Sequence, residues 1–162
     1  MMRRVLVTIG VAMLGGVGGL AQSPAAEETT NRTEITANKL VFDYAKRTAV
    51  FDGDVVAKDA TMRIESDRLI IQLDPQTQQL QAARAIGRVR ITEQDRIATA
   101  DEAEYTVADG RLVLTGQAMV MRGNERLSGA KITFWRTTNR VECERPVMIL
   151  LPGKEGSKGW GP

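Results

Sequence analysis

The sequence has no histidine and only one cysteine, Cys143, among its 162 residues. Histidine is the commonest general base and the commonest metal ligand, so its absence removes the usual catalytic pairs and zinc sites. A single cysteine cannot form a disulfide within the chain. We therefore predict no catalytic residue, no cofactor and no metal site, and we expect that the protein is not an enzyme.

Aromatic residues are also scarce, at 4% of the chain. Any core must then be built mostly from aliphatic side chains. Charged residues make up 26%, which is typical of a folded globular protein. The length suits one domain of ordinary size.

The N-terminus has the pattern of an export signal. A basic start, Met1–Arg4, precedes an apolar run over Val5–Leu20, and the small residues of GLAQSPAA follow. We predict a signal peptide over residues 1–26, cleaved between Ala21 and Ala26. The alternative is an uncleaved membrane anchor, but the run contains five glycines and is shorter than the ~20 residues that span a bilayer.

The net charge of +2 belongs to this leader, because removing Arg3 and Arg4 leaves 20 basic and 20 acidic residues. Charges of both signs are interspersed along the rest of the chain. A nucleic-acid-binding face needs clustered Lys and Arg. We therefore expect no nucleic-acid partner.

Four segments of the chain share one pattern of apolar, small and charged residues, which indicates an internal repeat. A polar connection rich in turn-forming residues follows each segment. The small residues at the third position are separated by 29, 34 and 29 residues. The segments are ITANKLVF from Ile35, IESDRLII from Ile64, ATADEAEY from Ala98 and LSGAKITF from Leu127.

A second strand of common shape follows each connection, and the first of these, AVFDGDVVA, contains Asp52-Gly53-Asp54. Taken alone, this tripeptide is compatible with a hairpin turn or with a divalent-metal site. The sister strands ARAIGRVRI and LVLTGQAMV keep the glycine but not the carboxylates, and the fourth, VECERPVMI, has Arg145 in its place. The glycine is therefore a repeated strand position.

Apolar and polar residues alternate along these second strands, which predicts one apolar face toward the core and one polar face toward solvent. In the first strands, however, the apolar spacing widens from two residues to three, as between Ala37 and Leu40. Such a phase change requires a bend or bulge. We predict corners at Asn38, Asp67, Asp101 and Ala130, and an all-β ladder of short antiparallel strands folded into two facing sheets.

The fourfold register together with an export signal resembles the periplasmic lipopolysaccharide-transport (LptA, OstA-like) family, and the resemblance runs from Thr33 to about Leu151. It implies an open, slightly twisted β-jellyroll over residues 33–151. The Gly-rich composition of residues 152–162 separately predicts a flexible tail. The resemblance also implies a periplasmic location, binding of lipid A acyl chains between the sheets, and head-to-tail assembly. The implied partners are further copies and the inner-membrane and outer-membrane transport components.

The inward positions of the repeat are then the candidate lipid-binding groove, and the first and last strands are the candidate assembly edges. Core packing without any lipid, as in a structural β-solenoid, is the alternative for the inward set. The groove residues are Ile35, Ala37, Leu40, Phe42, Phe51, Val55, Ile64, Leu69, Ile71, Ala85, Val89, Ile91, Tyr105, Leu112, Leu114, Val120, Ile132 and Phe134. The edge residues are Thr33, Glu34, Ile35, Val147, Met148, Ile149 and Leu150.

Overall fold

The computed structural model describes residues 5–9 and 33–150, and these residues form β-strands joined by turns. No helix in these ranges is long and apolar enough to cross a membrane. The predicted signal peptide and the tail over 152–162 lie outside the described residues, except for Val5–Ile9, which forms the first strand.

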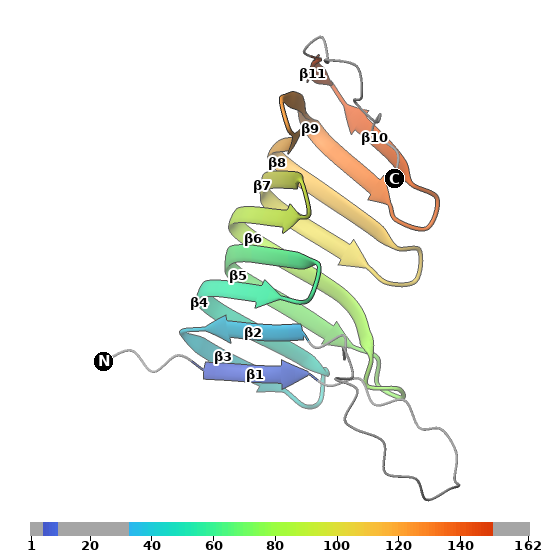
Figure 1. Cartoon of the computed structure of the whole chain (residues 1–162). Helices are drawn as coiled ribbons and strands as arrows, with labels where there is room; N and C mark the ends of the chain where they lie inside the picture. The colour runs from blue at the N-terminus through green and yellow to red at the C-terminus, as the bar shows by residue number, and fades with distance from the viewer. Residues whose placement is uncertain (1–4, 10–32, 151–162) are drawn as a thin grey trace, which may run out of the picture.

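All the described strands belong to one open sheet of eleven strands, in which every neighbouring pair is antiparallel (Figure 1). The order is β1-β2-β4-β5-β6-β7-β8-β9-β10, with β3 paired to β4 and β11 paired to β9. The chain is thus an all-β, open jellyroll. The strands are β1 (Val5–Ile9), β2 (Thr33–Ala37), β3 (Lys39–Asp43), β4 (Thr48–Lys58), β5 (Met62–Leu73), β6 (Leu80–Glu93), β7 (Arg96–Thr106), β8 (Arg111–Arg122), β9 (Glu125–Trp135), β10 (Arg140–Glu144) and β11 (Val147–Ile149).

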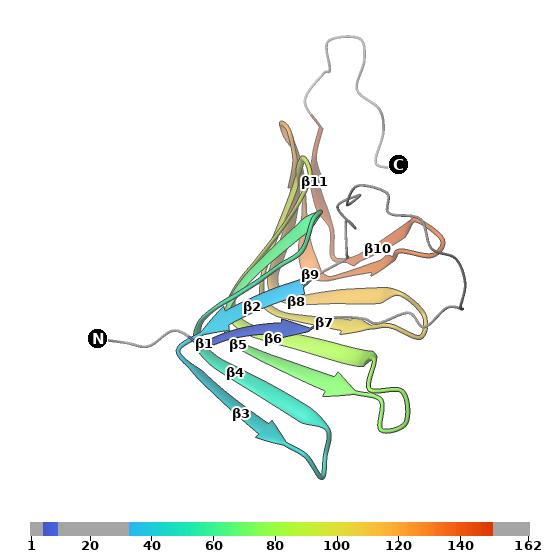
Figure 2. The same cartoon turned by 60° about the horizontal axis from the view of Figure 1, so that its bottom comes forward.

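The sheet is folded along its length into two arms that diverge from a crease (Figure 2). We call the side that contains β2 and β11 the β2 arm, and the side that contains β3 and β10 the β3 arm. Strands β4 to β9 cross the crease and contribute to both arms. The two facing sheets that the sequence predicts are the two arms of this one bent sheet.

The crease follows the predicted corners. The chain breaks between β2 and β3 at Asn38, and register shifts bracket Asp67, Asp101 and Ala130. The additional residue, however, lies on the facing glycine strand. Between Asp52 and Val55, β4 advances three residues while β5 advances only two.

Left-handed backbone at the glycine and the residue after it produces this bulge. Gly53 has φ +81° and Asp54 has φ +46°, and the pairs Gly87-Arg88 and Gly116-Gln117 repeat the conformation. Glycine adopts this region at little cost, whereas other residues rarely do. The repeated glycine therefore bends the sheet, and β4 continues through Asp-Gly-Asp without making a hairpin.

The predicted polar connections are turns at the outer end of the β3 arm. In the first two turns an aspartate, Asp43 or Asp74, accepts hydrogen bonds from the backbone two and three residues ahead, as in Asx-turns. The Asp74 carboxylate accepts the Thr77 N–H at 2.8 Å and the Gln76 N–H at 2.9 Å. These bonds, with one from the Thr77 hydroxyl, hold the pKa of Asp74 below its usual value.

Candidate functional site

The inner face of the folded sheet carries continuous rows of apolar side chains. One row crosses the β3 arm near the crease, from Leu40 on β3 to Cys143 on β10. A second row crosses the β2 arm, from Ile35 on β2 to Met148 on β11. In order across the strands, the first row is Leu40, Phe51, Leu69, Ala85, Ala103, Leu114, Ile132 and Cys143, and the second is Ile35, Ala57, Ile64, Ile91, Ala98, Val120, Leu127 and Met148.

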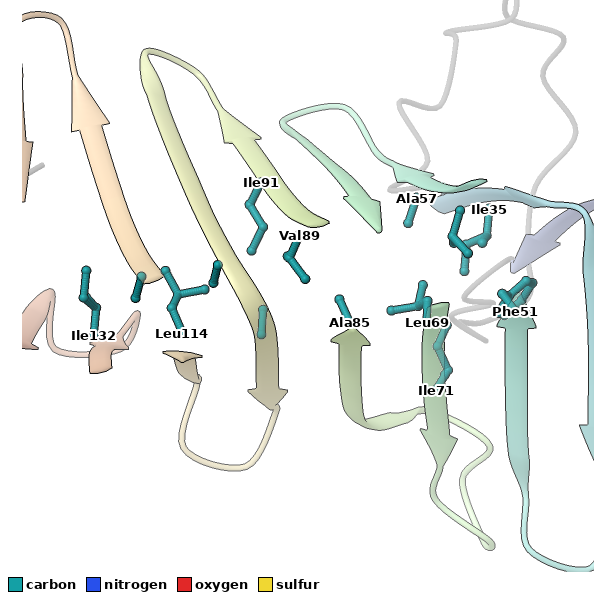
Figure 3. Close-up of a cluster of buried hydrophobic side chains, with 14 of the residues drawn as sticks. Ile35, Phe51, Ala57, Leu69, Ile71, Ala85, Val89, Ile91, Leu114 and Ile132 are labelled. Carbon is teal, nitrogen blue, oxygen red and sulfur yellow. The ribbon is translucent and has the colours of Figure 1, made fainter. Parts of the chain in front are cut away.

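Side chains from the two arms point toward one another across the interior (Figure 3). Phe51, Leu114 and Ile132 are at most 1% exposed. Twelve of the predicted groove residues are buried, and five more pack against them at partial exposure. The twelve are Ile35, Ala37, Phe51, Val55, Leu69, Ile71, Ala85, Val89, Ile91, Leu114, Val120 and Ile132, and the five are Leu40, Phe42, Ile64, Leu112 and Phe134.

Tyr105 is the remaining predicted groove residue, and it lies outside the buried cluster. It is half-buried and faces Ala83 on β6 and Leu112 on β8, farther from the crease on the β3 arm. Its register therefore places it on the inner face, at the outer margin of the apolar surface.

Several buried inner-face residues are absent from the predicted groove. Ala103 is 4% exposed and Leu127 is 8% exposed. The repeat contains the signal for both, because Ala103 occupies the position of Leu69 and Leu127 occupies the position of Ile64. The other buried apolar residues outside the predicted set are Ala49, Ala57, Ala100 and Ala118.

The middle of the sheet is lined by small side chains. On the inner face, β6 contributes Ala83 and Ala85, while β7 contributes Ala98, Ala100 and Ala103. The flanking strands carry Leu69 and Leu114 in the same row. The inner face is therefore lined by smaller side chains at β6 and β7 than on the flanking strands.

Cys143 ends the inner row of the β3 arm, opposite Ile132. It is half-buried, and burial raises the pKa of its thiol, with a further increase from the Glu144 carboxylate. A raised pKa keeps the sulfur protonated and unreactive at neutral pH. The side chain therefore behaves as a small apolar group.

The outer face carries ion pairs between neighbouring strands. Arg68 contacts Asp52 at 3.1 Å, and Arg84 contacts Glu102 at 2.6 Å. At the crease the Arg88 guanidinium binds Asp67, and its hydrogen bonds hold the pKa of that carboxyl below the usual value. Exposed pairs of this kind add little stability, but they keep this face polar. Among the described residues, no group of three or more acidic or cysteine side chains is placed to hold a metal ion.

The two ends of the sheet differ in what covers them. The predicted edge residues Val147, Met148, Ile149 and Leu150 are between 46% and 61% exposed. At the other end, β1 pairs with β2 along Thr33–Ala37, with Val5 opposite Ala37 and Ile9 opposite Thr33. Ile35 is buried within the sheet, whereas Thr33 and Glu34 are half-buried.

A family model described as LptA/(LptD N-terminal domain) LPS transport protein matches residues 34–140, which is more than half of the chain. The chain belongs to this family. The match begins in β2 and ends at the first residue of β10, so it contains the crease and most of both inner rows. Membership makes the chain a lipopolysaccharide-transport protein.

A solved structure agrees with this assignment at the level of the fold. LptH from Pseudomonas aeruginosa is described as the LptA-homologous periplasmic component of the lipopolysaccharide transport device. It superposes with a TM-score of 0.67 at 19% sequence identity, over 74% of this chain and 95% of LptH. No curated protein sequence matches the chain.

Proposed function

We propose that this member of the LptA/LptD N-terminal domain family is a periplasmic carrier that shields the acyl chains of lipopolysaccharide on their way from the inner to the outer membrane. The observation that supports it is the inner face, where an apolar row crosses eight strands on each arm. If the leader over Val5–Leu20 is kept as an anchor instead, the same domain acts at the inner membrane.

The energetic requirement for a carrier explains why an uninterrupted apolar face matters. Each CH₂ group exposed to water costs about 0.8 kcal/mol, so a 12-carbon chain costs roughly 9 to 10 kcal/mol. The inner rows offer a continuous apolar surface to such a chain. The alanines of β6 and β7 leave room there that larger side chains would fill.

Burial within the chain supports the competing reading of a filled, structural core. Phe51, Leu114 and Ile132 already lie against other residues of the same chain. A lipid must therefore enter where side chains are small, or the arms must separate to admit it. The two readings differ in whether lipid reaches the inner rows.

Photo-crosslinking distinguishes these readings. A photoreactive residue is placed at Phe51, Ala85 or Leu114 on the inner face, and at Asp52 or Arg84 on the outer face as a matched control. The protein is then purified from its own periplasm and irradiated. We expect lipopolysaccharide crosslinks at the inner positions only. Crosslinks at neither set, with lipopolysaccharide present, would assign the inner face to core packing and reject the carrier function.

We also propose that copies join head to tail through the two ends of the sheet, or join homologous domains of partner proteins in the same way. Unpaired strand edges readily accept another strand. The antiparallel pairing of β2 with β1, which belongs to the predicted signal peptide, supports the proposal that this edge accepts an added strand. At the opposite end, β11 presents exposed apolar side chains and has a neighbour, β9, on one side. Such an interface is heterologous and extends without closing.

A charge substitution at β11 tests the assembly. We expect the double variant Met148→Lys, Ile149→Lys to weaken self-association of the mature protein by at least about tenfold, because unpaired charges at an interface oppose its burial. Sedimentation velocity over a concentration series measures the effect. The control is Val107→Lys, since Val107 is 43% exposed in a turn. Unchanged assembly in the double variant would exclude β11 from the interface.

A further inference from the structure

A hollow lies on the outer face of the β2 arm, on the side of the sheet opposite the inner rows. It has a volume of about 660 Å³ and is open to solvent. Arg126 and Ser128 of β9 line it, whereas Leu127 between them is buried and does not. Successive side chains of a strand point to opposite faces. Most of the lining alternates with the inner-face residues and therefore places the hollow outside the jellyroll, although the buried Val89, Ala100 and Ala118 also line it next to the crease. We call it the outer groove.

The residues that line the outer groove come from β6 to β9. These four strands are neighbours in the sheet (Figure 1). Arg90, Thr99, Met119 and Ser128 are consecutive cross-strand partners, so their side chains form one line across it. The line spans three strand spacings, which is roughly 14 Å. The two central residues, Thr99 and Met119, are uncharged, and Arg90 lies at one end of the line. At the other end Arg126 lies two residues before Ser128.

Charge in the outer groove is unevenly compensated. Arg88 is paired with Asp67, outside the groove. Arg90 approaches Glu65 only to 4.0 Å. Arg126 has no ion pair with any residue of the described part of the chain, and Asp101 is the one carboxylate in the lining. Within the described residues, the positive charge at the two ends of the groove is therefore compensated at 4.0 Å for Arg90 and by no ion pair for Arg126.

The hydrogen-bonding groups in the groove suit an oxyanion. A guanidinium presents several N–H donors in a plane and binds phosphate oxygens in pairs. Thr99 and Ser128 add hydroxyl donors between the arginines, and Gln117 adds an amide. A volume of about 660 Å³ falls within the usual range for small-molecule sites. The favoured ligand is elongated, polar and anionic toward both ends.

We propose that the outer groove binds a phosphate-bearing headgroup, with Arg126 and Arg90 contacting phosphate at its two ends. The headgroup is either that of a lipid or a free sugar phosphate, since both present the same chemistry. This site is separate from the inner rows, and the proposal does not depend on acyl chains binding there.

Side-chain NMR of the full mature protein tests the proposal. The Nε–Hε signals of the arginines are followed during titration with glucose 1,6-bisphosphate, with inorganic phosphate, and with vesicles of phosphatidylcholine containing phosphatidic acid. Glucose is the uncharged control. We expect saturable shifts of Arg126 and Arg90 with the bisphosphate at lower concentration than with phosphate, and no shift of Arg111, which lies at the far end of β8.

The double variant Arg90→Ala, Arg126→Ala is expected to weaken binding by at least about tenfold, whereas Arg111→Ala leaves it unchanged. A response to vesicles alone, lost in the double variant, supports the site and identifies the source as a lipid headgroup. Equal shifts at all three arginines, or binding that the double variant retains, would overturn the proposal. Crosslinking at Phe51 in the double variant reports the inner face separately, so failure of one site is distinguishable from failure of the other.

Discussion

Phe51→Ala is expected to lower the free energy of unfolding by about 3–5 kcal/mol, the usual cost of removing a buried phenylalanine side chain. Phe51 is 1% exposed and lies between Leu40 and Leu69 in the inner row of the β3 arm. Urea denaturation followed by circular dichroism measures the loss.

Val41→Ala is the matched control for this substitution. Val41 is on β3, one residue from the partner of Phe51, but it is 50% exposed. Its truncation is expected to change stability by less than about 0.5 kcal/mol. A cost below about 1 kcal/mol for Phe51→Ala would contradict close contact between the arms and indicate that water already reaches this side chain in solution.

The result also bears on how a lipid enters. If Phe51→Ala has its full effect, the arms are closed over the inner rows without lipid. An acyl chain must then replace contacts such as those of Phe51 with equally apolar ones, so that little free energy is lost on exchange. The alanines of β6 and β7 are the places where such an exchange displaces the least protein.

The sequence predicts the inner face well because its alternation is regular. Each glycine strand alternates apolar and polar residues, and the repeat aligns four copies, so that positions such as Phe51, Ala85 and Leu114 reinforce one another. The corners are predictable for the same reason, since the apolar spacing changes by one residue in every copy. Ala103 and Leu127 are buried too, and their repeat positions, shared with Leu69 and Ile64, carry the same signal.

Other features depend on pairing between strands that the sequence does not specify. Each of the strands β4, β6 and β8 carries one additional, bulged residue, because Gly53, Gly87 and Gly116 tolerate positive φ. The alternation of apolar and polar residues does not predict which of two paired strands carries it. The outer groove requires Arg90, Thr99 and Ser128 to be aligned across strands. Each of these three is a polar residue on the solvent-facing side of the sheet, so no pattern along the chain identifies it as part of a binding site.

The crease itself is tested by Gly116→Ala, which is expected to lower the free energy of unfolding by about 2–4 kcal/mol. Gly116 has φ +72°, and an added Cβ would lie 2.6 Å from the Cβ of Asp101 on β7. The substitution therefore combines backbone strain with a steric clash inside the crease. Thermal and urea denaturation of the variant measure the total.

Gly123→Ala separates the two contributions. Gly123 also has positive φ, at +56°, but no atom lies within 4 Å of the position its Cβ would take. We expect a cost of about 1 kcal/mol from the backbone alone. The excess in Gly116→Ala then measures the clash, and combining that variant with Asp101→Gly should recover part of it, because neighbouring substitutions couple. Equal costs at the two glycines would show that Asp101 yields freely and that the crease depends on glycine only for its backbone conformation.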